Sequence, residues 1–359
     1  MERMKLDKYT AGSFEGESSK IIVTTVPGLE DIVLEEAYEK INVLSSEARF
    51  GNVGGRVLLI VPRSQVDRVF NLRSIEHIIQ LIETFNINSD RSGLDQVYRW
   101  VYKLDIPLGS TFRVTCDRIG VHEFTSIDVQ KTAGQALVDK YGRKVDLKNP
   151  ETIVRVDVAH NLCIVGIQKT RTSLRVRYQR IFQHYSALNP VIAYAMLRIA
   201  DVKPGDRVLD AFCGGGTIII EAAQVWDNID LLGVDISPKS IDGAWRNAEA
   251  AGVKDKVRFI VGDSRRLERV LPADWKVDKV VSNLPFGIRS GRLKVIPSIY
   301  TEFMKSLKQF LKESSRICLL TVHRVLVEEI ADNLGYSVID SRHILHGGLK
   351  AWIMLLSQK

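Results

Sequence analysis

Residues 283–287, which read Asn-Leu-Pro-Phe-Gly, combine groups that can act on the exocyclic amine of a planar base. Such an amine is a poor nucleophile, because its lone pair is delocalised into the ring. Two acceptors on its N–H groups can draw the nitrogen towards a tetrahedral geometry, and we expect the Asn283 side-chain oxygen and the Leu284 carbonyl to be these acceptors. Pro285 stiffens the turn, and Phe286 offers the base a stacking face worth about 1–3 kcal/mol. The plainer alternative is a strand that ends in a proline turn with Phe286 in the core.

A glycine-rich segment, residues 210–217 (DAFCGGGT), lies between a buried strand predicted at 207–211 and a helix predicted at 217–225. Gly214 and Gly216 let a ligand approach the backbone without a Cβ in the way, and the helix start offers free N–H groups to an anion. The third glycine of a dinucleotide-binding GxGxxG loop is absent. We therefore expect a carboxylate such as that of methionine here, with Asp210 accepting from the ligand's ammonium group. The same glycines are also compatible with a tight turn in any α/β sheet.

Acidic residues also end the next two predicted strands. Asp235 ends strand 231–235, 19 residues after Gly216, at a position that reads ribose hydroxyls in doubly wound sheets. Asp263 follows strand 257–261 and can accept from an adenine amino group. Each acid alone could be a cap, but three at successive strand ends of one sheet edge predict S-adenosyl-L-methionine, with S-adenosyl-L-homocysteine as product. The residues of these motifs predicted to contact it are Asp210, Phe212, Gly214, Gly216, Thr217, Asp235, Ile236, Asp263, Ser264 and Asn283.

Strands and helices alternate from residue 189 to the end at 359, which is typical of a parallel α/β sheet. Ser237 and Pro238 begin a helix that ends before Gly252, a pattern of capping residues that marks both of its ends. The last elements are strands 337–345 and 351–356, joined by a Gly-Gly turn. This terminal hairpin favours a class I, Rossmann-like methyltransferase sheet with one antiparallel strand over a nucleotide-binding dehydrogenase.

The first half of the chain predicts two α+β modules after a tail at 1–19. Residues 20–92 follow the order of a ferredoxin-like split βαβ module, with strands at 21–26, 55–61 and 75–82, and helices at 29–37 and at 66–72, the latter capped by Ser64. Residues 93–168 form the second module. Its predicted elements are strand 111–115, helix 126–141 and the hairpin strands 152–158 and 162–167.

Basic residues concentrate in a linker predicted at 169–188. The chain has 359 residues, a net charge of +7 and a pI near 9.1, but residues 160–190 contain no Asp or Glu, so this stretch is a plausible phosphate track. Two arginines after residue 287 are equally compatible with a phosphate clamp and with a solvated surface. The predicted RNA contacts are Lys169, Arg171, Arg175, Arg177, Arg180, Arg289 and Arg292.

The composition argues against several other classes of protein. No apolar run approaches the ~18 residues of a membrane span, and the N-terminus lacks the apolar core of a secretory signal. The four cysteines show no CxxC spacing, and the seven histidines show no metal or triad spacing. We expect a cytoplasmic monomer without a metal site and without membrane association.

The two catalytic motifs together resemble those of the amino-methyltransferases with an (Asn/Asp)-Pro-Pro-(Tyr/Phe) signature, with Leu284 in place of the first Pro. The Asn-Leu-Pro-Phe-Gly version is similar to that of the THUMP-domain RNA methyltransferases, particularly the archaeal enzymes for guanine N2 at position 6 of tRNA. The resemblance covers nearly the whole chain. It extends to Gly120, His122 and residues 124–134, 145–147 and 149–150, which look like a THUMP fold, and to 185–190, which look like the lead-in to the cofactor domain.

This resemblance implies an S-adenosylmethionine-dependent tRNA guanine-N2 methyltransferase whose first two modules hold the acceptor stem and 3′ end. Its implied catalytic residues are Asn283, Leu284, Pro285 and Phe286, and it implies further cofactor contacts from Ala187, Leu188 and Asn189 of the lead-in. Guanine at another tRNA position such as G10, adenine N6 and a protein glutamine are alternative targets, the last two being disfavoured by the THUMP-like half. An RNA-binding protein with a decayed cofactor fold is the non-enzyme alternative, which the intact set of acids, glycines and Asn283 disfavours.

Overall fold

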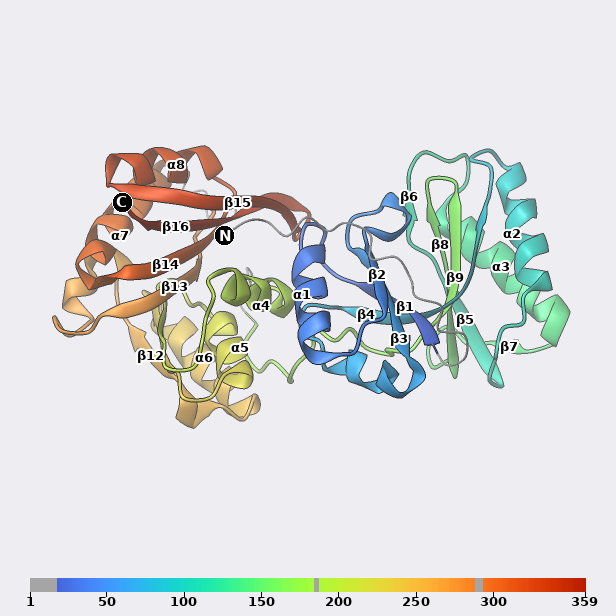
Figure 1. Ribbon diagram of the computed structural model, residues 1–359, viewed down its shortest axis with the longest axis horizontal. Coiled ribbons are helices and arrows are strands. Elements are labelled where there is room, and N and C mark those ends of the chain that lie inside the picture. Colours follow the sequence, from blue (N-terminus) through green and yellow to red (C-terminus); the bar gives the residue numbers. More distant parts are fainter. Residues whose placement is uncertain (1–17, 184–186, 288–292) are drawn as a thin grey trace. The chain divides into compact units, whose positions relative to one another are not determined.

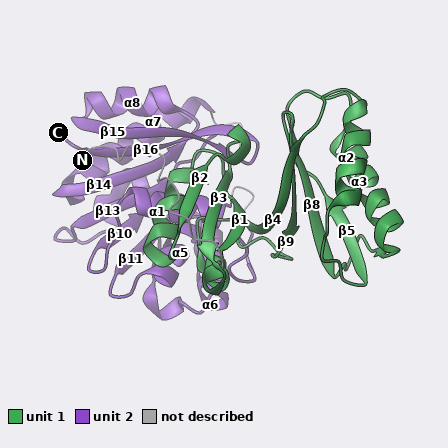
Figure 2. Cartoon of the chain, turned by 45° about the vertical axis from the view of Figure 1, so that its right-hand side comes forward, with its two compact units in different colours: residues 1–174 green, residues 175–359 purple. Residues whose placement is uncertain are grey.

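The computed structural model describes residues 18–183, 187–287 and 293–359, and it divides into two compact units, residues 1–174 and 175–359 (Figure 2). Tyr185 and Ser186 of the predicted lead-in, and the predicted RNA contacts Arg289 and Arg292, lie outside the described residues. No helix among the described residues is long and apolar enough to cross a membrane.

The second unit is built on a seven-stranded sheet with the order β12-β11-β10-β13-β14-β16-β15. The strands β10 to β14 are parallel, whereas β16 runs antiparallel between β14 and β15, so the predicted methyltransferase sheet with its terminal hairpin is confirmed. The elements, most of which are labelled in Figure 1, are α4 Pro190–Ile199, β10 Arg207–Asp210, α5 Thr217–Val225, β11 Asp230–Asp235, α6 Pro238–Ala250, β12 Arg258–Val261, β13 Val277–Asn283, α7 Ile296–Leu307, β14 Leu311–Thr321, α8 Arg324–Asn333, β15 Tyr336–His346 and β16 Leu349–Gln358.

Side-chain alternation along these strands gives the sheet two apolar faces. Residues of one face, such as Leu209, Val280 and Ile317, form a single core with the buried sides of α7 and α8. Helices α4, α5 and α6 pack against strands β10, β11, β12 and β14. Because parallel strands share their carboxyl edge, the ends of β10, β11, β12 and β13 meet at one edge of this sheet.

The first unit contains one continuous nine-stranded sheet rather than two separate ones. Its first part has the order β2-β3-β1-β4, the ferredoxin-like order, and β4 pairs antiparallel with β9 of the second part. The elements are β1 Ser18–Thr24, α1 Glu30–Lys40, β2 Ser45–Ala48, β3 Arg56–Pro62, β4 His77–Asn86, α2 Ser92–Lys103, β5 Thr111–Thr115, β6 Arg118–Ile119, α3 Ser126–Tyr141, β7 Lys144–Val145, β8 Thr152–Ala159 and β9 Leu162–Gln168.

Helix α3 shows why the sequence pattern located most of these elements. Thr125 caps it through a capping box with Asp128, and Gly142 follows its end with a φ of 62°. Its buried residues Val129, Ala133 and Leu137 belong to the core that α2 and α3 form with the second part of this sheet. Figure 2 shows these two helices beside β5 and β8.

The helix predicted at 66–72 with a Ser64 cap is wrong. The segment Arg63–Asn71 is a 3-10 helix without a side-chain cap, and Val69 is its one buried residue. Val66, Val69 and Leu72 recur every three residues and pack in or against one core, a spacing that suits the three residues per turn of a 3-10 helix.

Candidate active site

Two glycines of the loop after β10 have left-handed backbone conformations. Gly214 has a φ of 51° and Gly216, the residue before α5, has a φ of 81°. A Cβ on Gly216 would lie 2.9 Å from the Phe259 ring, whereas a Cβ on Gly214 would meet no described atom within 4 Å. Gly216 is therefore needed for packing, and Gly214 leaves open space in which a ligand can approach the chain.

Asp210 is buried at the end of β10, where its side chain accepts the Phe212 backbone N–H at 3.2 Å. Burial disfavours the ionised carboxylate and raises the pKa of Asp210 to about 7. A cationic ammonium group beside this carboxyl would reverse that effect by stabilising the charged form. The predicted bond from the ammonium group of the cofactor to Asp210 stays a prediction.

Asp235, at the end of β11, accepts two backbone N–H groups, from Gly214 at 3.0 Å and from Ser237 at 2.9 Å. Each carboxylate oxygen thus uses one acceptor site and keeps further lone pairs for ribose hydroxyls. The next residue, Ile236, is 64% exposed and presents an apolar surface at the same edge.

Asp263 and Ser264, after β12, already have hydrogen-bond partners within the protein. Asp263 forms an ion pair with Arg265, with 2.6 Å between the guanidinium and the carboxylate, and hydrogen bonding from Arg265 lowers the pKa of Asp263. The buried Ser264 hydroxyl donates to the Ala211 carbonyl. Ser264 therefore ties the ends of β12 and β10 together, and its predicted contact with the cofactor stays a prediction.

The predicted catalytic turn, residues 283–287, begins at the last residue of β13. The Asn283 side-chain oxygen is buried and receives no hydrogen bond from any described residue. A buried acceptor without a donor costs roughly 1–3 kcal/mol, so such a group is a candidate for pairing with a ligand. Phe286 is half-buried and lies perpendicular to the His346 ring, with 6.4 Å between ring centres.

The predicted lead-in residues sit close to the glycine loop. Asn189 caps α4 through its own side chain, at 3.1 Å from the Val191 N–H, and Leu188 is buried. Arg180 donates to the Leu188 carbonyl at 3.0 Å and to the Thr217 hydroxyl at 3.4 Å. Ala187 is half-buried, and Phe212 packs edge-on against Phe303 with 5.0 Å between ring centres.

The basic segment is divided by the structure. Lys169, Arg171 and Arg175 are exposed. The Arg177 side chain is 9% exposed and forms an ion pair with Glu221 at 3.6 Å. Arg177 and Arg180 therefore have structural partners within the second unit. Their predicted contacts with phosphate stay predictions.

Asn247 was not found from the sequence, yet it joins two parts of the site. Its side-chain oxygen accepts the N–H groups of Ile181 and Phe182 at 3.0 and 2.9 Å, and its amide donates to Phe182 O and Gly215 O at 2.9 and 3.0 Å. All four hydrogen-bonding positions of this buried amide are used. The available signal was a polar residue on the buried stripe of α6, between Ala244 and Ala248.

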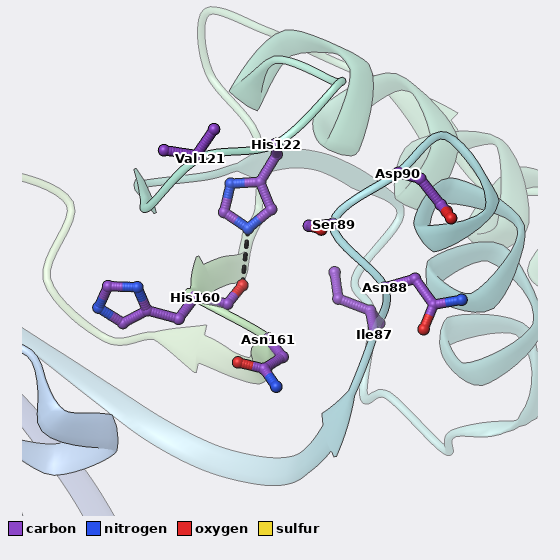
Figure 3. Close-up of a pocket in the computed structure, with 8 residues that line it drawn as sticks. All are labelled: Ile87, Asn88, Ser89, Asp90, Val121, His122, His160 and Asn161. Atoms are coloured by element: carbon purple, nitrogen blue, oxygen red, sulfur yellow. Dashed lines mark hydrogen bonds between the residues drawn. The ribbon is translucent and has the colours of Figure 1, made fainter.

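A pocket with a volume of about 590 Å³ lies in the first unit (Figure 3). His122 donates from Nε2 to the His160 carbonyl at 2.6 Å, so its Nδ1 accepts from Arg118 at 2.8 Å. The lining is mostly polar and comes from the β4–α2 connection, the loop before α3 and the β8–β9 turn; it comprises Ile87, Asn88, Ser89, Asp90, Val121, His122, His160 and Asn161.

Comparison with known proteins places these two units in a family. The model of the RMKL-like methyltransferase domain matches residues 177–351, and that of the THUMP domain matches residues 91–168. The tRNA (guanine(6)-N2)-methyltransferase of Thermus thermophilus is 34% identical over 93% of this chain and 98% of its own length, and that of Archaeoglobus fulgidus is 30% identical over 95% and 93%. The crystal structure of TrmN from Thermus thermophilus matches with a TM-score of 0.80 and 32% identity over 95% of this chain and 99% of that one. This chain therefore belongs to the S-adenosylmethionine-dependent RNA methyltransferases that combine a THUMP domain with an RMKL-like methyltransferase domain, the family of the tRNA (guanine(6)-N2)-methyltransferases.

Proposed function

We propose that this enzyme methylates the exocyclic N2 of guanine 6 in the acceptor stem of tRNA. The observation that carries the proposal is the buried Asn283 oxygen without a described donor, placed at the carboxyl edge of a cofactor-binding sheet. The shared name of the two relatives that match nearly the whole chain supports guanine N2 and position 6.

The residues of the turn have distinct tasks in this reaction. S-adenosylmethionine supplies a methyl group on a sulfonium centre. Asn283 Oδ1 and the Leu284 carbonyl accept hydrogen bonds from the two N–H groups of the guanine amine. These hydrogen bonds strengthen as the nitrogen becomes tetrahedral. Phe286 stacks on the base, which offsets part of the few kcal/mol that flipping a base from a duplex requires.

The cofactor residues act by positioning the methyl donor. Asp210 binds its ammonium group, and the start of α5 after Gly216 binds its carboxylate. Asp235 binds the ribose hydroxyls. Arg265 donates to both oxygens of Asp263, so Asp263 binds the adenine amine by exchanging part of that contact. The predicted contacts of Ala187, Leu188, Asn189, Phe212, Thr217, Ile236 and Ser264 remain part of this proposal.

We assign binding of the acceptor stem and 3′ end of tRNA to the first unit. Its polar pocket, which includes the THUMP-like residue His122, and the exposed Lys169 and Arg171 support this assignment. The proposed division is a ferredoxin-like module at 20–92, a THUMP domain at 93–168, a linker at 169–188 and a methyltransferase domain at 189–359. We also infer a cytoplasmic monomer; all four cysteines are free and buried, which is consistent with a reducing compartment.

Mass spectrometry of an in vitro transcribed tRNA tests this function. The enzyme with S-adenosylmethionine should produce N2-methylguanosine at position 6, and replacing the 6–67 pair by A–U should abolish the product. Methylation of the altered transcript at position 10 would move the target to G10, and N6-methyladenosine at position 6 would support the adenine alternative.

A further inference from the structure

The catalytic turn, residues 283–287, has Leu284 where the (Asn/Asp)-Pro-Pro-(Tyr/Phe) signature has its first proline. A hydrogen bond at Leu284 compensates for the absence of that proline. The Leu284 N–H donates to the Leu320 carbonyl at 3.0 Å, and the Leu284 side chain is 2% exposed within the core of the second unit. A proline has no N–H and could not make this bond. The backbone at Leu284 is therefore fixed by a hydrogen bond to β14 instead of by a proline ring.

The next carbonyl of the turn is held by Tyr300. The Tyr300 hydroxyl, on the buried side of α7, lies 3.0 Å from the Pro285 carbonyl and 3.2 Å from the Thr321 hydroxyl. A carbonyl only accepts, so the single phenolic proton goes to Pro285 and Thr321 donates to Tyr300. Burial raises the pKa of Tyr300, which keeps this donor protonated.

The carbonyl after that is held by His323, which follows β14. His323 Nε2 lies 2.8 Å from the Phe286 carbonyl, and the same argument requires the proton to be on Nε2. The His323 backbone N–H binds the Thr321 hydroxyl at 2.9 Å, and its ring lies edge-on to Tyr300 with 6.2 Å between centres. Thr321 thus connects the Tyr300 hydroxyl to the backbone of His323.

We propose that Tyr300 and His323 are positioning residues that replace the rigidity of the missing proline. They fix the peptide planes after Pro285 and Phe286, and so they fix the directions of the Asn283 oxygen, the Leu284 carbonyl and the Phe286 ring. This inference rests on the proposed function of the turn. Neither side chain touches the substrate; each acts on the reaction through the backbone of the turn.

The test compares Tyr300→Phe and His323→Leu with two matched controls. Tyr336→Phe removes another buried hydroxyl of the same unit that donates to a backbone carbonyl, Met304 O at 2.8 Å. His323→Gln keeps an N–H donor near the position of Nε2. Each variant is assayed for kcat on the tRNA that the wild-type enzyme methylates, for affinity towards S-adenosylhomocysteine, and for amide hydrogen exchange at residues 283, 284, 286 and 287.

We expect Tyr300→Phe and His323→Leu to lower kcat by about 10-fold or more, since a misplacement of ~1 Å can cost about 10²-fold. Exchange of the turn amides should become faster, while cofactor affinity stays within a factor of about two. Tyr336→Phe and His323→Gln should retain kcat within a factor of about three. Unchanged kcat and exchange in Tyr300→Phe and His323→Leu, or equal damage by His323→Gln and His323→Leu, would overturn the inference. A failure of the proposed function would instead appear in the wild-type enzyme as a product at another base, and the comparison of variants would still stand on that product.

Discussion

The Asp235 carboxylate accepts the Gly214 backbone N–H at 3.0 Å, so the acid that ends β11 holds the glycine loop that follows β10. One side chain thus shapes the loop and faces the predicted ribose site. The two roles are linked, because Gly214, which has a φ of 51°, could adopt many other conformations if the Asp235 carboxylate did not hold its N–H.

Asp235→Ala should weaken binding of S-adenosylhomocysteine strongly. It removes the predicted bonds to two ribose hydroxyls, worth ~1.5–3 kcal/mol each for a charged acceptor, and it releases the Gly214 amide. Calorimetry on the full-length enzyme measures this loss. Asp242→Ala, an exposed acid on α6 paired with Arg246, is the control and should bind normally. Unchanged affinity in Asp235→Ala would exclude the ribose role.

Cofactor affinity should depend on pH through Asp210. Its pKa before binding is raised to about 7 by burial, and the cationic ammonium group pairs with the ionised form. Binding therefore requires loss of a proton below that pH, so affinity should rise as the pH increases through about 7 and then level off. Asp210→Asn should bind more weakly at pH 8 and lose this dependence. Calorimetry at several pH values would contradict the account if wild-type affinity were flat between pH 6 and 8.

Binding of tRNA should weaken with salt through the exposed part of the basic segment only. Each phosphate neutralised contributes about −0.9 to the log–log slope on a duplex. Lys169→Glu with Arg171→Glu should make that slope shallower by about two. Arg177→Gln should lower the melting temperature, because it breaks a buried pair with Glu221, and leave the slope unchanged. If Arg177→Gln altered the slope as much as the double variant, Arg177 would be a phosphate contact after all.

A buried ionic cluster should stabilise the first unit. Asp157 of β8 accepts from Arg56 of β3 at 3.0 Å and from Arg155 at 2.9 and 3.1 Å, and all three side chains are buried. Asp157→Leu removes the acid that pairs with Arg56 and one of the two acids that pair with Arg155. Breaking a buried ion pair in this way typically costs about 3–5 kcal/mol. Urea unfolding measures this free energy. Asp117→Ala removes the more exposed acid that pairs with Arg155 and should cost about 1 kcal/mol or less. Equal losses in the two variants would show that the cluster is not an electrostatic unit.

The sequence predicted the elements that have local signals. Helix α6 has Ser237 and Pro238 at its start, and the β15–β16 hairpin has its Gly347-Gly348 turn, so both were located. The pairing of β4 with β9 was missed, because strands far apart in the chain carry no local mark of their partner. The motif acids and Asn283 stand at strand ends and could be found. Asn247, Tyr300 and His323 could not, because each acts on a backbone group that is distant in sequence.

Kinetics should distinguish the role of Phe286 from that of Asn283, the other proposed partner of the base. Phe286→Ala removes a stacking surface that is present before and during methyl transfer, so both KM and kcat on tRNA should suffer. Steady-state assays with saturating cofactor measure both parameters. A change in neither parameter would place the Phe286 ring outside the base site.

The most direct test of the account is kcat of Asn283→Ala on tRNA with saturating S-adenosylmethionine. The buried Asn283 oxygen is proposed to form a bond that strengthens as the nitrogen becomes tetrahedral. Its loss should lower kcat by a factor on the order of 10², comparable to the removal of one transition-state hydrogen-bonding group, with little change in KM. Asn283→Asp, which keeps an acceptor, should retain partial activity. A kcat for Asn283→Ala near that of the wild-type enzyme would contradict the mechanism and place the catalytic acceptor outside this turn.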